Sequence, residues 1–224
     1  MTSAIAMSRI QQALEKQDSE FNANLTYWDF EDALNKGLSD WIRRQIHGGN
    51  QYLEGAEETT MRVDDLQILL MEKSLKVRNN SQFSDTDTIP SNYRYYNRLT
   101  VYTSKEDCNS VIIPSMFIES ANVNEYLHNW NFSPSFDFEQ CFHIMLNSKF
   151  RIFHGGDFKI DKVLLTYYRN PIKIRCEKIF LDEKWEWKDD VAEVIIDEAI
   201  KILSAAIEHN TALQVSMGRE QANN

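Results

Sequence analysis

Cysteine, glycine and proline are scarce in this sequence, which holds three, seven and four of them among 224 residues. Cys108, Cys141 and Cys176 lie far apart and are odd in number, so we expect neither a disulfide framework nor a structural zinc site. We expect them to be small buried side chains of a protein that folds in a reducing compartment. The few glycines form neither GxxxxGK(S/T) nor GxGxxG, so a phosphate-binding loop is not expected.

Basic residues are in the minority. Lys and Arg total 24 against 34 for Asp and Glu, which gives a net charge of −10. A surface this negative repels phosphate backbones, so we do not expect sequence-independent binding of DNA or RNA. The chain has no run of apolar residues long enough to cross a membrane, and its start lacks the hydrophobic stretch of a signal peptide. We therefore expect neither a membrane span nor export through the secretory route.

The patterns that carry catalysis are missing as well. No two of the five histidines have the spacing of a helical metal pair, and no GxSxG segment is present. Asp137, Glu139 and Asp161 are carboxylates that the fold could bring together around a metal ion. In a chain with 34 carboxylates, solvated surface is the simpler interpretation. We expect no enzyme, no cofactor and no metal site. A carboxylate- and metal-dependent nuclease or hydrolase stays open as an alternative.

Helical periodicity is present at both ends of the chain. A helix is predicted over 4–19, and a clearer one begins at Thr26, three residues before Asp29 as in a capping box, and ends at Gly48–Gly49. A third helix is predicted over 59–74, and Asp189–Asp190 begins the final one. The apolar face of the second helix consists of Phe30, Ala33, Leu34, Leu38, Trp41 and Ile42, and that of the final helix includes Val191, Val194, Ile195, Ala199, Ile202, Ala205 and Ala206.

Between the helices the apolar period changes to that of strands, with turn residues Gly155–Gly156–Asp157 predicting a hairpin. Strands are predicted at 75–78, 93–95, 99–103, 111–114, 141–146, 150–154, 158–168 and 172–174. We therefore predict an α+β fold in which N-terminal helices and a long C-terminal helix form a bundle, interrupted by an antiparallel β-rich insertion. The predicted parts are 1–75, the N-terminal helical part of the bundle; 76–175, the β-rich insertion; and 176–224, a loop, the C-terminal helix and a polar tail.

Aromatic residues are plentiful, with 12 Phe, 9 Tyr and 5 Trp, and buried interfaces select such side chains. Arg43 and Arg44 stand at the end of the second helix, where we favour a local role opposite the helix's negative end over pairing with a neighbouring copy. The candidate interface residues are Trp41, Arg43, Arg44, Asp64, Asp65, Phe180, Trp185 and Trp187.

Several segments together resemble the neck-ring proteins of tailed bacteriophages, particularly those of the crAss-like phages. Their order and spacing cover nearly the whole chain, although each segment alone is weak. They are Ala33–Lys36 with Trp41–Gln45, Asp64–Leu66, Ile89–Tyr93, Pro134–Phe136 and Tyr167–Ile172.

The resemblance implies a virion structural protein, made in the host bacterial cytoplasm. It implies a homo-oligomeric ring, twelve-fold as is usual for portals, that joins the portal and capsid to the tail. Other neck or tail proteins would be its partners, and genomic DNA would pass through the ring without specific binding. An acidic lumen would let the DNA slide. A cytosolic adaptor protein without a viral role is a further alternative.

Overall fold

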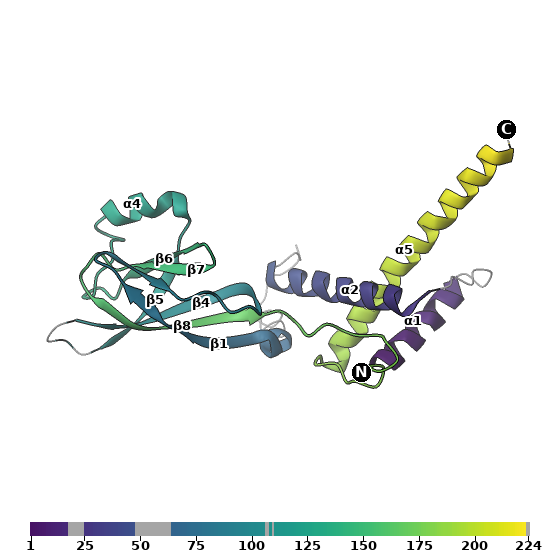
Figure 1. The fold of residues 1–224 in the computed structure, drawn as a ribbon, viewed down its shortest axis with the longest axis horizontal. Helices are drawn as coiled ribbons and strands as arrows, with labels where there is room; N and C mark the ends of the chain where they lie inside the picture. Colours follow the sequence, from purple (N-terminus) through teal and green to yellow (C-terminus); the bar gives the residue numbers. More distant parts are fainter. Residues whose placement is uncertain (18–24, 48–63, 106–107, 109, 223–224) are drawn as a thin grey trace, which may run out of the picture. The chain divides into compact units, whose positions relative to one another are not determined.

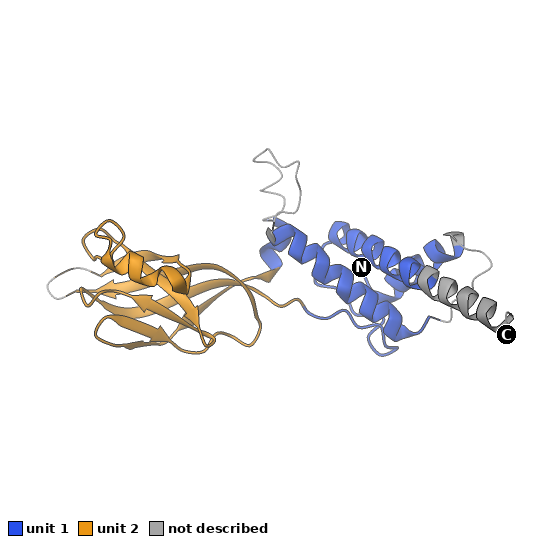
Figure 2. Cartoon of the chain, turned by 90° about the horizontal axis from the view of Figure 1, so that it is seen from above, with its two compact units in different colours: residues 1–68, 172–224 blue, residues 69–171 orange. Residues whose placement is uncertain are grey.

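The computed structural model describes residues 1–17, 25–47, 64–105, 108 and 110–222. The chain divides into two compact units (Figure 2). Unit 1 consists of 1–68 and 172–224, and unit 2 consists of 69–171. Within the described residues, no helix combines the length and apolarity that crossing a membrane requires.

Unit 1 is built from helices α1 (Ser3–Gln17), α2 (Tyr27–His47) and α5 (Asp189–Ala222), and α5 packs against both others. The α2 helix begins at a side-chain cap, because the Asp29 carboxylate accepts hydrogen bonds from both the backbone N–H and the hydroxyl of Thr26, at 2.7 and 2.8 Å. The face predicted for this helix is the buried one, from Phe30 to Ile42.

The buried face of α5 differs from the prediction. Val194 is exposed, as are Ala205 and Ala206, so the predicted stripe is displaced around the helix. At Gly37 the two helices come close, because an added Cβ would lie 3.2 Å from the carbonyl oxygen of Ile195. The buried α5 residues are Val191, Ala192, Ile195, Ile196, Ala199 and Leu203.

Unit 2 is an eight-stranded sheet with the order β1-β8-β4-β5-β6-β7-β3-β2 (Figure 1). Its two ends approach each other, since β2 contacts β8 and the side-chain amide of Asn79 donates to the carbonyl oxygen of Ile160 at 2.9 Å. The sheet is therefore nearly closed and barrel-like. The strands are β1 (Leu70–Leu75), β2 (Val77–Asn79), β3 (Phe83–Thr86), β4 (Tyr93–Ser104), β5 (Val111–Phe117), β6 (Cys141–Leu146), β7 (Lys149–Phe153) and β8 (Lys159–Arg169).

The sheet encloses one apolar core and carries a second outside it. The inner core collects side chains such as Leu99, Ile113 and Phe150, all at most 1% exposed. The outer core lies under the short helix α4 (Val123–His128), which follows the 3-10 turn η2 (Ser120–Asn122) and covers β6 and β7 (Figure 1). Side chains on both faces of β6 are therefore buried, with Phe142 and Ile144 against α4.

The predicted fold class is wrong. The structure is a mixed α/β fold dominated by the nearly closed sheet, not a helical bundle interrupted by an antiparallel insertion. The predicted third helix is limited to 64–66 and the 3-10 turn η1 (Gln67–Leu69) within the described residues, because β1 follows it at Leu70 and pairs with β8. The sheet is not purely antiparallel either, since β5 and β6 run parallel.

Two local expectations have different outcomes. The turn predicted at Gly155–Gly156–Asp157 is present, with Gly155 and Gly156 at φ values of +61° and +83°. The predicted hairpin is wrong, because β7 pairs with β6 and β3 whereas β8 pairs with β1 and β4. The predicted strand at 172–174 is wrong, because this segment joins no sheet and belongs to unit 1.

Candidate interaction surfaces

The segment that precedes α5 is anchored in unit 1 by its two tryptophans. Trp187 is 5% exposed and meets Trp41 edge to face, with ring centroids 5.2 Å apart. The indole N–H of Trp185 donates to the Ser3 hydroxyl at 3.0 Å, and its backbone N–H donates to the Met1 carbonyl oxygen. Trp185 and Trp187, two of the candidate interface residues, therefore both contact other residues of unit 1.

The remaining candidate interface residues lie nearer the surface. Phe180 is half-buried beneath the Arg175 guanidinium, 4.7 Å from its ring centroid. Asp65 lies 3.4 Å from the ammonium of Lys188, whereas Arg43 and Asp64 are exposed.

Arg44 crosses to α5 and pairs with the Glu198 carboxylate at 3.0 Å. Burial alone would raise the pKa of Glu198, but hydrogen bonds from Lys201 and Arg44 outweigh it and lower that pKa. The structure thus gives Arg44 a bond to a neighbouring helix of the same chain, a different role from the expected one at the end of its own helix.

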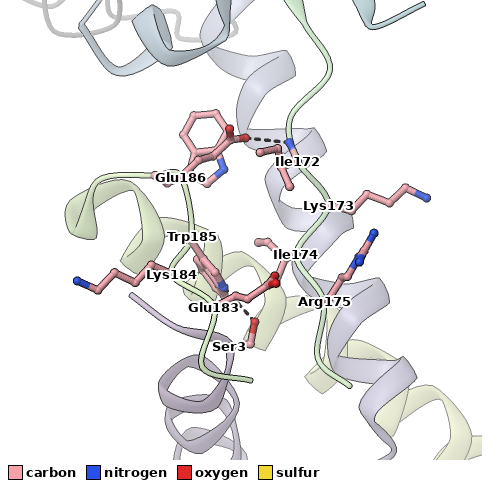
Figure 3. Close-up of a pocket in the computed structure, with 10 residues that line it drawn as sticks. Ser3, Ile172, Lys173, Ile174, Arg175, Glu183, Lys184, Trp185 and Glu186 are labelled. Atoms are coloured by element: carbon pink, nitrogen blue, oxygen red, sulfur yellow. Dashed lines mark hydrogen bonds between the residues drawn. The ribbon is translucent and has the colours of Figure 1, made fainter. Parts of the chain in front are cut away.

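A small cavity lies within unit 1 between residues 172–175 and 183–187, with Ser3 at one end (Figure 3). We call it the 172–187 slot; its volume is about 120 Å³. At its other end the Glu186 carboxylate accepts a hydrogen bond from the backbone N–H of Ile172 at 2.9 Å. Figure 3 shows Lys173 and Arg175 pointing away from the slot on one side and Lys184 on the other.

The α2 helix holds one wall of the slot in place. The side chain of Asn35 accepts from the backbone N–H of Ile174 at 3.0 Å and donates to its carbonyl oxygen at 2.8 Å. The Glu31 carboxylate accepts from the N–H of Cys176 at 3.1 Å. These two polar side chains on α2 were not identified as important from the sequence, although Asn35 lies in the segment that carries the resemblance.

Trp187, one of the residues that line the slot, has an indole N–H without a partner among the described residues. Trp187 lines the slot and is nearly fully buried. A buried donor without an acceptor costs about 1–3 kcal/mol, and this nitrogen has almost no accessible surface, so a group in the slot does not reach it.

A second, larger cavity in unit 1 has a volume of about 550 Å³ and lies between α1 and the start of α2. Its apolar lining includes Met7, Tyr27, Phe30 and Leu181. It has no charged lining residue, and its polar side chains are those of Ser8, Gln11 and Thr26.

Unit 2 exposes large apolar side chains in two places. Ile112 and Met116 project from β5 on the side that faces away from the inner core, and Phe117 is half-exposed at the strand's end. Trp130, Phe132 and Phe138 follow α4 in the segment before β6, where Trp130 is 82% and Phe138 74% exposed. Exposed aromatic side chains of this size are typical of protein interfaces.

Phe138 stands at the end of a short, fixed loop. Ser135 and Gln140 exchange two backbone hydrogen bonds of 2.9 Å at its base. Between them, Asp137 and Glu139 are exposed on either side of Phe138. We call residues 137–139 the acidic tip; the Pro134–Phe136 segment of the resemblance leads into it.

The inner face of unit 2 contains a hydrogen-bonded serine and histidine. Ser115 Oγ lies 2.8 Å from His143 Nδ1, and His143 Nε2 has no partner among the described residues. Burial lowers the pKa of His143 to about 3 and raises that of the adjacent Cys141 thiol to about 11. All three side chains are buried, which favours a structural role for this neutral pair.

The carboxylates considered for a metal site are not brought together. Asp161 accepts a hydrogen bond from Ser104 at 3.0 Å, whereas Asp137 and Glu139 belong to the acidic tip. Among the residues that the structure describes, no group of three or more His, Cys, Asp or Glu side chains has the arrangement of a metal site.

Comparison with protein-family models and with curated protein sequences finds no match to this chain.

Proposed function

We propose that this chain is a virion structural protein, one subunit of a ring in the neck of a tailed phage that joins the portal and capsid to the tail. The observation that carries the proposal is the exposure of large apolar side chains on both units. Trp130 and Phe138 on unit 2, and Ile172 and Ile179 on unit 1, are each at least 66% exposed. Isolated apolar residues are ordinary on a surface, but aromatic groups on structured loops are what interfaces select.

A ring needs two different faces on each subunit, because its contacts are heterologous: one face of a copy meets the other face of the next. Two compact units offer two such faces. The proposed ring has twelve copies, to match a portal, with other neck or tail proteins above and below it.

The acidic surface supports the proposed channel. With a net charge of −10 per chain, a ring of many copies repels DNA phosphates, so the genome can pass without being held. This part of the proposal requires the channel wall to be neutral or acidic.

The test is electron cryomicroscopy of the purified chain, alone and mixed with the portal protein of the same phage. The proposal expects a closed ring in at least one of the two samples, with a channel wide enough for duplex DNA. A chain that stays monomeric in both samples, or a ring with a basic channel wall, would contradict it.

A further inference from the structure

The outward side of β5 is apolar where a strand that faces water is usually polar. Strands of a sheet with one solvated face alternate apolar side chains inward with polar ones outward. In β5 the outward positions are Ile112, Pro114 and Met116, and all three are exposed, whereas the inward position between the last two is Ser115. Ile112 is 55% and Met116 45% exposed. The alternation is therefore inverted at this end of the strand, and three apolar side chains in a row face away from the core.

The neighbouring strands extend this surface and add positive charge to it. Tyr102 on β4 lies between Ile112 on β5 and Lys162 on β8, and the Lys162 ammonium lies 5.3 Å from the centroid of the Tyr102 ring. Further along β4, the exposed guanidinium of Arg98 shares its charge with Glu72 at 3.4 Å. We call the outward side chains of β5, with Tyr102 and Lys162, the β5 face. Helix α4 does not cover it, because α4 lies over β6 and β7 (Figure 1).

The segment that crosses from β5 to β6 has the opposite charge. Residues 118–140 contain four Asp and Glu and no Lys or Arg, whereas the rest of unit 2 has 11 Lys and Arg against seven Asp and Glu. The first part of this segment contains α4, and Glu119 and Glu125 there are exposed. We call residues 119–132 the α4 layer. A cationic surface on a second chain therefore finds its complement here.

The α4 layer also presents aromatic side chains in fixed positions. Trp130 is 82% exposed, and Phe132 is 49% exposed. The Phe132 ring packs against Tyr126 at 5.4 Å between centroids, and Tyr126 packs against the buried Phe142 at 5.7 Å. Tryptophan on a structured segment is typical of the residues that contribute most to binding. Because the outer core already holds this segment, little conformational entropy is lost when it is bound.

We propose that the α4 layer of one copy packs on the β5 face of the next. Trp130 and Phe132 then cover the apolar row of β5, and Glu119 and Glu125 lie toward Lys162. The occupant is a second copy because one chain carries both surfaces yet cannot join them, since α4 is fixed over β6 and β7. Two β5 faces would set like charges against each other. The contact is heterologous, so each copy gives its α4 layer to one neighbour and its β5 face to another. It rests on the proposed ring and names the surfaces that build it.

Photochemical crosslinking tests which surfaces meet. A benzophenone amino acid replaces Met116 in one sample, Trp130 in a second and, as the matched control, the exposed Met145 of β6 in a third. Each sample is an equal mixture of isotopically light and heavy full-length chains, so that mass spectrometry separates crosslinks between copies from those within one. The samples are irradiated in whichever condition the wild type assembles, alone or with the portal.

We expect the probe in place of Met116 to join residues 119–132 of a different copy. The probe in place of Trp130 should join outward positions of β5, β4 or β8 of a different copy. The control probe in place of Met145 should form neither crosslink, because that position lies outside both surfaces.

Substitutions then measure what the contact contributes to assembly. Ile112→Asp with Met116→Asp disrupts the apolar row of the β5 face, and Trp130→Ala with Phe132→Ala removes the aromatic groups of the α4 layer. We expect the concentration needed for assembly, measured by sedimentation, to rise about a hundredfold in each double variant.

The matched control for the charged variant is Met71→Asp with Met145→Asp. It places the same two charges on exposed apolar positions of unit 2 outside both surfaces, so it should assemble as the wild type does. Thermal melting identifies any variant that has lost its fold, and for that variant the crosslinks decide.

Other results overturn the inference. If the wild type forms a ring but the probes crosslink elsewhere or only to the portal, or the folded double variants assemble normally, the two surfaces do not pair, while the proposed function stands. If the probe in place of Met116 joins the β5 face of another copy, the contact is isologous and the proposed pairing is wrong. If the expected crosslinks form in an assembly that is not a closed ring, the pairing holds and the proposed function fails. If the wild type assembles in neither condition, both fail.

Discussion

Acidification should destabilise unit 2 through one residue, His143. Its imidazole is fully buried, lies between the rings of Tyr96, Phe117 and Phe150, and has a single hydrogen bond, to Ser115. In the unfolded chain the same imidazole titrates near its ordinary pKa of about 6.5. In the fold, burial lowers the pKa to about 3, so the imidazole stays neutral.

The size of the effect follows from the two pKa values. Between about pH 6.5 and pH 3 the unfolded chain binds a proton that the folded chain does not, so stability falls as pH falls. From pH 7.5 to pH 5, linkage gives a loss of about 2 kcal/mol in the free energy of unfolding. Burial raises the pKa of Tyr96 to about 12 and that of Cys141 to about 11, so neither neighbour titrates in this range.

The measurement is hydrogen–deuterium exchange of the β6 and β7 amides at pH 7.5 and pH 5, in the wild type and in His143→Gln. The variant removes the titrating group and keeps an acceptor for Ser115. Comparing the two proteins at the same pH cancels the intrinsic exchange rates. It also cancels His154, whose pKa is lowered by burial and which remains in both.

We expect the stability difference between wild type and His143→Gln to shift by about 2 kcal/mol between the two pH values, in favour of the variant at pH 5. If the stability difference between wild type and His143→Gln were the same at both pH values, the substitution would have changed packing alone. Such a result would refute the assignment of a neutral, buried imidazole in the folded state.

Three further predictions concern packing and backbone, each measured by thermal unfolding. Gly37→Val should destabilise unit 1 by about 2 kcal/mol or more, because its side chain meets α5 backbone, whereas Val at the exposed neighbour Lys36 should cost under about 1 kcal/mol. Equal costs would contradict the close helix approach. Gly156→Ala should cost more than Gly155→Ala, since both have positive φ but only at Gly156 would the Cβ lie 2.9 Å from a backbone oxygen. Asn35→Ala should cost about 2–3 kcal/mol by leaving two backbone groups of the slot wall without partners; an unchanged melting temperature would show that the wall does not depend on it.

Sequence periodicity predicts well where one element buries one face against its neighbours. The α2 face from Phe30 to Ile42 follows this rule and is buried as expected. It fails for β1, because Leu66, Leu69 and Leu70 have helical spacing, yet the chain from Leu70 onward pairs with β8. Pairing with a strand about ninety residues away overrides a local pattern, and no local pattern reports it.

Residues 172–176, which form one wall of the slot, show a second limit of prediction from sequence patterns. Residues 172–176 have the alternation of a strand, and every second backbone N–H is indeed hydrogen bonded. The acceptors are side chains of Glu186, Asn35 and Glu31, so the alternation is real although no sheet is present. A sequence pattern reports that a segment is extended and held on one side; it does not report what holds it.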